Sequence, residues 1–419
     1  MIARVRDARR QEWTRAADEG RASRSWVYPG LDLLGAAAFI YSLVVGDWLL
    51  AGLLGVLFAS SAVAWYYRVL VPESLRVRLE VQPHRVFPDK PLEVRLTLRN
   101  EGRLPLPWVR LEVHLPRTAQ TDLKLQMSPY DAVLWLPLSL QGKEQVERRI
   151  ALSVPGRGLH RVGKPAAHVA DPLGVDDART DLEGGTEFLC YPRLHDVHLR
   201  MREALPLGER RGRSFLDEQS RYLGPRPYQA TDPLRRIDWR QSARRGDLFV
   251  RTYETVATAQ TAIFLDPTTA RTAWDGIDTE VLEATVELTG SIAHDLIGRG
   301  QAVGLYVTGV FSEAAGRRPF SVRERPRGGP QQLARILAAL AQLRPPGLFR
   351  DLPRILVEEL PTLDYQVQII AIAPYLTQEL QLALLRASRD HRTFFAQTGP
   401  SAPGDPELPP RVRPLVVTS

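Results

Sequence analysis

The sequence predicts a multidomain α/β protein with an N-terminal helical hairpin, an all-β sandwich-like domain and a C-terminal doubly wound sheet. Three observations predict this order. Two apolar runs lie near the N-terminus, a stretch of alternating apolar and polar residues follows, and strand-like and helix-like segments alternate after Glu254. A chain of 419 residues has room for about three domains.

The composition limits the function classes. Hydrophobic residues make up 44% of the chain and charged residues 25%, values that are typical of folded protein and exclude wholesale disorder. The single cysteine, Cys190, excludes an intrachain disulfide and any multi-thiolate zinc or iron–sulfur site. The net charge of +7 permits contact with anionic lipid or nucleic acid without requiring either.

The hairpin is predicted from apolar runs at 33–45 and 48–67, which are separated by Gly46-Asp47. The second run carries no charge and is long enough for the ~30 Å hydrocarbon core of a bilayer. We therefore expect two transmembrane helices within 26–71. A signal peptide is disfavoured because the better apolar run begins near position 48, and a buried core hairpin because that run has no polar stripe. Aromatic residues stand where an interfacial belt would lie: Trp26, Tyr28, Trp48, Trp65, Tyr66 and Tyr67.

The basic residues predict the orientation of this hairpin. Seven arginines precede it in the basic segment 1–25, three follow it at Arg68, Arg76 and Arg78, and the turn has none. The positive-inside rule then places both ends, and the domains that follow, in the cytoplasm. We expect an inner-membrane protein with its soluble domains on the cytoplasmic side.

From 72 to 198 the apolar residues recur with a period of two, which is typical of half-buried antiparallel strands. About seven short strands without a helical stretch indicate a β-sandwich-like domain. Cys190 lies in the last of them, where we expect a buried apolar filler and not a nucleophile. The predicted strands are Leu75–Gln82, Leu92–Asn100, Val109–Pro116, Val133–Leu140, Gln145–Val154, Leu159–Asp171 and Thr186–Pro192.

The segment 199–258 mixes arginines with carboxylates and aromatic residues. A planar guanidinium can pair with a carboxylate while lying on a ring, so this composition suits a dense salt-bridge and cation–π network. Docking of a protein partner and contact with phosphate or nucleic acid remain as alternatives, because RRIDWRQSARR is strongly basic.

The run RPYQATDPLRRIDWRQSARRGDLFVRTYE, from Arg226 to Glu254, resembles the signature of the bacterial family known as domain of unknown function number 58. Many members carry Pro-Gly-Asp where this chain has Ala230-Thr231-Asp232. The resemblance extends from about Leu31 onward and implies a membrane-anchored protein that works with a MoxR-type AAA+ ATPase. The residues assigned to the motif and partner site are Arg226, Tyr228, Asp232, Arg236, Asp238, Trp239, Ser242, Arg244, Arg251, Tyr253 and Glu254.

Residues 259–400 alternate strands with helices, which predicts a mostly parallel sheet covered on both faces. The run TAIFLD is continuously apolar before its final Asp266, as expected of a strand buried on both sides. A Pro-rich tail, 401–419, follows. The predicted strands are Thr261–Asp266, Ala302–Gly309, Tyr365–Pro374 and Arg392–Gly399, and the predicted helices are Glu280–Ile297, Gln331–Leu343, Leu352–Leu360 and Thr377–Ser388.

This order resembles a von Willebrand factor A domain, in which a D-x-S-x-S loop after the first strand binds a divalent cation. Asp266 and Thr268 match the first two ligand positions, but Ala270 stands at the third. Alanine offers no oxygen ligand to Mg²⁺, and the later strand end at 371–374 has no carboxylate. We expect no metal or other cofactor here, with Asp266 and Thr268 as the degenerate candidates.

The sequence carries no P-loop, dinucleotide-binding, zinc-protease or nucleophile-elbow motif. Cys190 with His195 is a weak candidate for a nucleophile–base pair, so we expect no enzyme. The predicted function is a membrane-anchored cytoplasmic scaffold or adaptor, with a MoxR-type ATPase as the implied partner in assembly or maturation of other proteins. The alternatives are a cation-dependent ligand receptor and a nucleic-acid-binding membrane protein.

Overall fold

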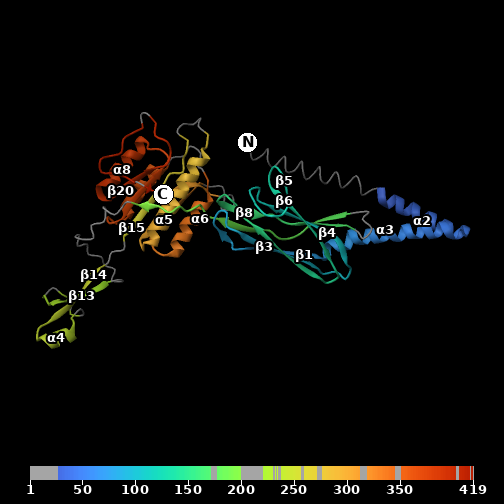
Figure 1. The fold of residues 1–419 in the computed structure, drawn as a ribbon, viewed down its shortest axis with the longest axis horizontal. Helices are drawn as coiled ribbons and strands as arrows, with labels where there is room; N and C mark the ends of the chain where they lie inside the picture. The colour runs from blue at the N-terminus through green and yellow to red at the C-terminus, as the bar shows by residue number, and fades with distance from the viewer. Residues whose placement is uncertain are drawn as a thin grey trace. The chain divides into compact units, whose positions relative to one another are not determined.

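A computed structural model describes residues 27–170, 177–199, 220–229, 232, 234, 237–255, 259–270, 276–311, 319–344, 351–402, 405–415 and 417–418. The chain divides into two compact units (Figure 1). The first comprises 1–155 and 160–188, and the second comprises 156–159 and 189–419. The predicted basic segment 1–25 lies outside the described residues.

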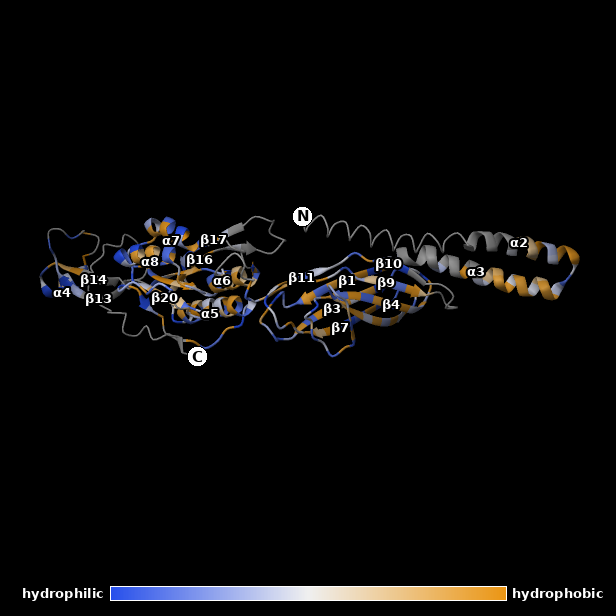
Figure 2. Cartoon of the chain, turned by 90° about the horizontal axis from the view of Figure 1, so that it is seen from above, coloured by the Kyte–Doolittle hydropathy of each residue, from blue (hydrophilic) through white to orange (hydrophobic). Residues whose placement is uncertain are grey.

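The first unit begins with the helices α2 (Val27–Val45) and α3 (Trp48–Ser74), which are joined at the predicted turn. The Asp47 carboxylate caps α3 by accepting a hydrogen bond from the Leu50 amide at 3.2 Å. Figure 2 shows the hydrophobic colouring of both helices close to this turn. In the described part of the chain, no helix is long and apolar enough to cross a membrane, so the expected transmembrane helices are not supported.

Two antiparallel sheets form most of the rest of the first unit. One has the order β1-β3-β7, and its strand β3 buries Val94, Leu96 and Leu98 completely while the intervening residues face outward. The other has the order β10-β9-β4-β6-β5. Their bounds are β1 Leu75–Gln82, β3 Leu92–Asn100, β4 Leu106–Leu115, β5 Leu125–Met127, β6 Ala132–Leu140, β7 Gln145–Leu152, β9 Ala166–Ala170 and β10 Asp177–Asp181.

A third sheet has the order β2 (Arg85–Val86), β11 (Thr186–Cys190) and β8 (Gly158–Val162). The single strand predicted over 159–171 is wrong, because β8 and β9 are separate strands in different sheets. The break falls at Gly163-Lys164-Pro165, where proline has no amide hydrogen to donate to a ladder.

The second unit is built on a mixed sheet with the order β17-β16-β15-β19-β20-β21, and β18 also pairs with β16. Strand β15 is parallel to both β16 and β19, so the strand order reverses at β15, and β17 is an antiparallel edge. The bounds are β15 Gln260–Leu265, β16 Ala302–Phe311, β17 Pro319–Arg327, β18 Leu343–Arg344, β19 Gln368–Ala373, β20 Thr393–Gln397 and β21 Arg413–Pro414. A separate pair joins β12 (His198–Leu199) to β22 (Val417–Thr418).

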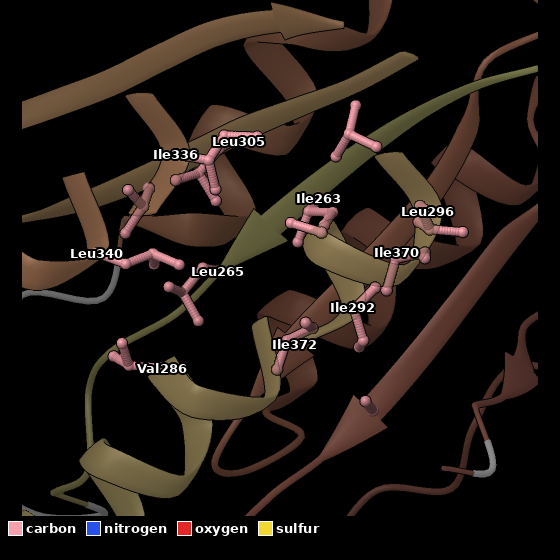
Figure 3. Close-up of a cluster of buried hydrophobic side chains, with 14 of the residues drawn as sticks. Ile263, Leu265, Val286, Ile292, Leu296, Leu305, Ile336, Leu340, Ile370 and Ile372 are labelled. Carbon is pink, nitrogen blue, oxygen red and sulfur yellow. The ribbon is translucent and has the colours of Figure 1, made fainter. Parts of the chain in front are cut away.

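Helices cover both faces of this sheet: α5 (Thr279–Gly298) and α6 (Pro330–Gln342) on one, α7 (Leu352–Glu359) and α8 (Gln378–Asp390) on the other. A short 3₁₀ turn, Leu360–Thr362, follows α7. Alternate residues of each central strand point to opposite faces, so Ile263 packs against α5 and Phe264 against α7 and α8. Figure 3 shows the cluster on the α5 and α6 face.

The segments that connect the units pack on α5 and α6 within the second unit. Leu189 and Tyr191 form a small buried cluster with Leu337 and Ala341 of α6. The Arg157 side chain is 6% exposed and donates to the carboxylate of Glu283, so this segment is held on α5 by charge as well as packing within the second unit.

Candidate functional site

The family-like motif forms a compact element of two strands and one helix, here called the motif element (residues 220–255). Strands β13 (Ser220–Pro227) and β14 (Phe249–Thr255) pair antiparallel, and helix α4 (Trp239–Arg245) lies between them in the sequence. Ile237 bridges to Val250, and both side chains are buried, so the chain entering α4 is fixed to β14.

Arg226 and Asp232 close the turn after β13. The two guanidinium Nη atoms donate to both carboxylate oxygens, at 2.7 and 2.5 Å, and the Gln229 amide donates to the same carboxylate at 2.9 Å. The hydrogen bond to Asp232 raises the pKa of Arg226. This bidentate pair is the type of arginine–carboxylate contact that the sequence predicts for the segment.

Asp238 and Ser242 hold α4 in place from its buried side. Asp238 caps the helix by accepting from the Gln241 amide at 3.2 Å, and its own amide donates to the Phe249 carbonyl at 2.8 Å. The Ser242 hydroxyl accepts from the Phe249 amide at 2.9 Å. Gly246 ends the helix in the left-handed conformation that favours glycine. These polar groups are inward, so their role is to shape the element.

Trp239, the first residue of the same helix, is 67% exposed. Arg240 and Arg244 are also exposed and lie one turn apart on α4. Arg245 lies over the Phe249 ring, with its guanidinium carbon 5.1 Å from the ring centroid. Exposed tryptophan and arginine side chains on one short helix are a composition enriched in protein interfaces. We call Trp239, Arg240 and Arg244 the docking face.

The structure thus separates the predicted motif residues into two groups. Arg226, Asp232, Asp238 and Ser242 bond within the element, whereas Trp239 and Arg244 point away from it. The Tyr228 amide donates to the Leu248 carbonyl. Arg236 lies outside the described residues, as do the side chains of three motif residues whose backbone belongs to β14: Arg251, Tyr253 and Glu254.

Sequence reasoning missed two exposed leucines of the motif element, Leu234 at 67% and Leu248 at 44% exposure. Both stand in turn-like stretches, where an isolated apolar residue shows neither the helix nor the strand period. Their sequence signal was only their isolation among charged neighbours.

The second candidate site, the loop after β15, is buried and internally bonded. Asp266 is 7% exposed and its carboxylate accepts from the Thr268 amide at 2.9 Å. The Thr269 hydroxyl accepts from the Asp278 amide at 3.1 Å, which ties the loop to the start of α5. Ala270, which stands at the third position of the candidate ligand loop, is buried. Within the described residues, no group of three or more His, Cys, Asp or Glu side chains is placed to hold a metal ion.

Solved structures with partial likeness include the CARDB domain of PF1109 from Pyrococcus furiosus and a cohesin module from Clostridium perfringens. The first matches 28% of this chain and 91% of its own at 17% identity and a TM-score of 0.20. The second matches 28% and 96% at 14% identity and a TM-score of 0.23. Scores this low do not establish a shared fold.

Among curated proteins, the uncharacterized protein YeaD of Bacillus subtilis (strain 168) is 24% identical over 288 residues, which cover 67% of each chain. The family model described as "Protein of unknown function DUF58" matches residues 224–401, which include most of the motif element and the α/β sheet up to the end of β20. The predicted resemblance is thereby confirmed over residues 224–401, where the chain is similar to the DUF58 family.

Proposed function

We propose that this protein is a membrane-attached scaffold or adaptor that binds another protein through the docking face and catalyses no reaction. The observation that carries the proposal is the contrast across one helix turn. Asp238 and Ser242 are buried and bonded, whereas Trp239 is two-thirds exposed beside Arg240 and Arg244. Residues that only stabilised the element would not leave an indole in water.

Tryptophan and arginine are the residues that most often dominate binding energy at interfaces. The proposed partner presents an acidic surface with an apolar recess, so that carboxylates pair with the guanidinium groups as the indole becomes buried. The family resemblance adds an identity for that partner, a MoxR-type AAA+ ATPase, and a role in assembly or maturation of other proteins.

The α/β domain serves in this proposal as a von Willebrand factor A-like binding platform. Its strand order, reversal at β15 and antiparallel edge β17 support that fold class. We propose that the loop at Asp266 works without a cation, because its carboxylate already accepts a backbone amide and Ala270 supplies no ligand.

We further propose that the hairpin α2–α3 attaches the protein to the bacterial plasma membrane, with the two units on the cytoplasmic side. The support is the number of large apolar side chains that the hairpin exposes, far more than water favours. They are Ile40, Tyr41, Leu43, Val44, Val45, Trp48, Leu49, Leu50, Leu53, Val56, Leu57, Phe58 and Val63.

The test is the affinity of the full-length protein for the purified MoxR-type ATPase of the same organism, measured by surface plasmon resonance with the protein in nanodiscs. Trp239→Ala should weaken binding by more than about tenfold, because central interface tryptophans cost ~2 kcal/mol or more when truncated. The double change Arg240→Gln with Arg244→Gln should also weaken binding, and the loss of affinity should be larger at low salt than at high salt.

Matched controls come from the same unit. Tyr365 is 61% exposed, and Arg386 and Arg389 are exposed on α8, so Tyr365→Ala and the double change Arg386→Gln with Arg389→Gln remove equivalent groups elsewhere. These variants should bind like the wild type. Equal losses from both sets, or undiminished binding by Trp239→Ala, would overturn the proposed docking face.

A further inference from the structure

The end of the first unit next to the C-terminus of α3 carries an exposed mixture of cations and apolar side chains. Trp108 is 64% exposed and Leu104 38%. Four exposed basic residues lie on loops 101–105 and 141–144 and on the adjoining strand ends. We call the whole set the helix-end surface: Arg76, Arg99, Arg103, Leu104, Trp108 and Lys143.

A network of hydrogen bonds attaches this surface to α3. The Tyr67 hydroxyl on α3 donates to the Pro105 carbonyl at 2.9 Å, and the Glu101 amide donates to the Ser74 carbonyl, at the last residue of the helix, at 2.8 Å. Asn100 is fully buried, and its side-chain amide donates to the carbonyls of Leu104 and Gln141 at 2.8 and 3.0 Å. These hydrogen bonds tie the two loops to the end of the helix.

The two loops also lie in direct contact with each other. A Cβ atom on Gly142 would fall 2.0 Å from the Arg103 carbonyl oxygen, so only glycine permits this approach. Lys143 donates from its ammonium group to the Glu101 carbonyl and from its amide to the Gly102 carbonyl. The positions of Arg103 and Lys143 side by side are thus set by the backbone and not by chance side-chain orientation.

The charge of the surface is net positive. Its four cations face two exposed carboxylates, Glu101, which lies 3.6 Å from the Arg76 guanidinium, and Glu144, which accepts from the Gln141 amide. An amphipathic indole flanked by lysine and arginine is the composition that favours the headgroup layer of an anionic bilayer.

We infer that the helix-end surface docks on anionic phospholipid headgroups. The inference rests on the proposed attachment through α2–α3, because lipid insertion of the hairpin would bring this end of the first unit to the membrane. Trp108 and Leu104 enter the interfacial layer, and Arg76, Arg99, Arg103 and Lys143 pair with lipid phosphates. The surface thereby holds the first unit against the bilayer and limits its tilt relative to the membrane plane.

The experiment uses the full-length protein reconstituted into vesicles of phosphatidylcholine, alone or mixed with phosphatidylglycerol, that contain lipids brominated near the headgroup. The signal of Trp108 is the difference in quenched fluorescence between the wild type and Trp108→Phe. We expect strong quenching of Trp108 in the anionic vesicles. Two nearby cations are worth about thirtyfold in such a docking equilibrium, so Arg103→Gln with Lys143→Gln should largely remove the gain that phosphatidylglycerol gives.

The control removes two cations from the opposite end of β1, Arg85→Gln with Lys90→Gln, both of which are exposed. This control should quench like the wild type, and high salt should abolish the gain in the wild type without any substitution. Equal quenching with and without phosphatidylglycerol, or equal loss in the control, overturns the inference. A protein that floats with the vesicles while Trp108 stays unquenched overturns this inference alone, whereas one that does not float overturns the proposed attachment as well.

Discussion

The buried hydroxyl of Tyr306 gives the sharpest prediction about the α/β unit. Tyr306 lies on β16 with its ring stacked on Phe264 at a centroid distance of 4.7 Å, and both residues are 0% exposed. Among the described residues its hydroxyl has no hydrogen-bond partner. An unsatisfied buried polar group costs about 1–3 kcal/mol. Tyr306→Phe keeps the ring and removes the hydroxyl, so it should raise the free energy of unfolding by about 1–2 kcal/mol.

The pH dependence gives an independent magnitude. Burial raises the pKa of Tyr306 from 10.0 to about 12, and the nearby Glu359 carboxylate acts in the same direction. Between these two values the unfolded chain releases the phenolic proton while the folded chain keeps it, so stability is lost as the pH rises. At pH 11 the wild type should have lost about 1.4 kcal/mol relative to its value near pH 8, a loss that Tyr306→Phe lacks.

The assay is urea unfolding of the two full-length chains followed by circular dichroism at both pH values. The chains differ by one oxygen atom, so contributions from the first unit cancel in the comparison. Tyr306→Leu, which also removes the stacking on Phe264, should instead be destabilised by more than about 1 kcal/mol. A Tyr306→Phe chain that is less stable than the wild type would instead show that the hydroxyl is a satisfied group.

Three further substitutions test other parts of the account. Asp238→Ala removes the cap of α4 and should cost the motif element about 1 kcal/mol, measured as faster hydrogen exchange over residues 239–245. Gly304→Ala would place a Cβ 2.6 Å from a backbone oxygen of β17, so the edge strand should shift. The free energy of unfolding should fall by about 1–3 kcal/mol, measured as a lower thermal midpoint. Arg157→Met leaves Glu283, which is 40% exposed, without its partner and should lower the free energy of urea unfolding by about 1 kcal/mol. Adding Glu283→Gln should restore part of this loss.

The regular periodicities of the sequence predicted their elements closely. Period-two alternation placed β1 and β3 at their observed bounds, because one face of each strand is buried and the other is wet. Continuous apolar runs identified β15 and β19, whose residues are buried on both faces of the sheet. Local composition was sufficient to predict a strand wherever burial alone decides which residue type stands at each position.

Other elements depend on tertiary context. Strand β17 was not predicted, because its two prolines and alternating charges do not resemble a strand. A strand at the edge of the sheet can contain proline, because one side of it has no neighbouring strand to bond. The same limit applies to the motif. The sequence indicated which residues belong together, but only the packing of α4 shows that Ser242 faces inward and Trp239 outward. Charged and aromatic residues occur on both kinds of surface, so their identity does not reveal direction.

Site-specific cross-linking shows whether Trp239 contacts a protein partner. A photoreactive benzoylphenylalanine is placed at Trp239 or, as a control, at Leu382, which is 60% exposed on α8. Each full-length chain in nanodiscs is irradiated with the purified MoxR-type ATPase. The account predicts an adduct from position 239 and none from position 382. Adducts of equal yield from both positions, or an adduct from position 382 alone, would contradict it.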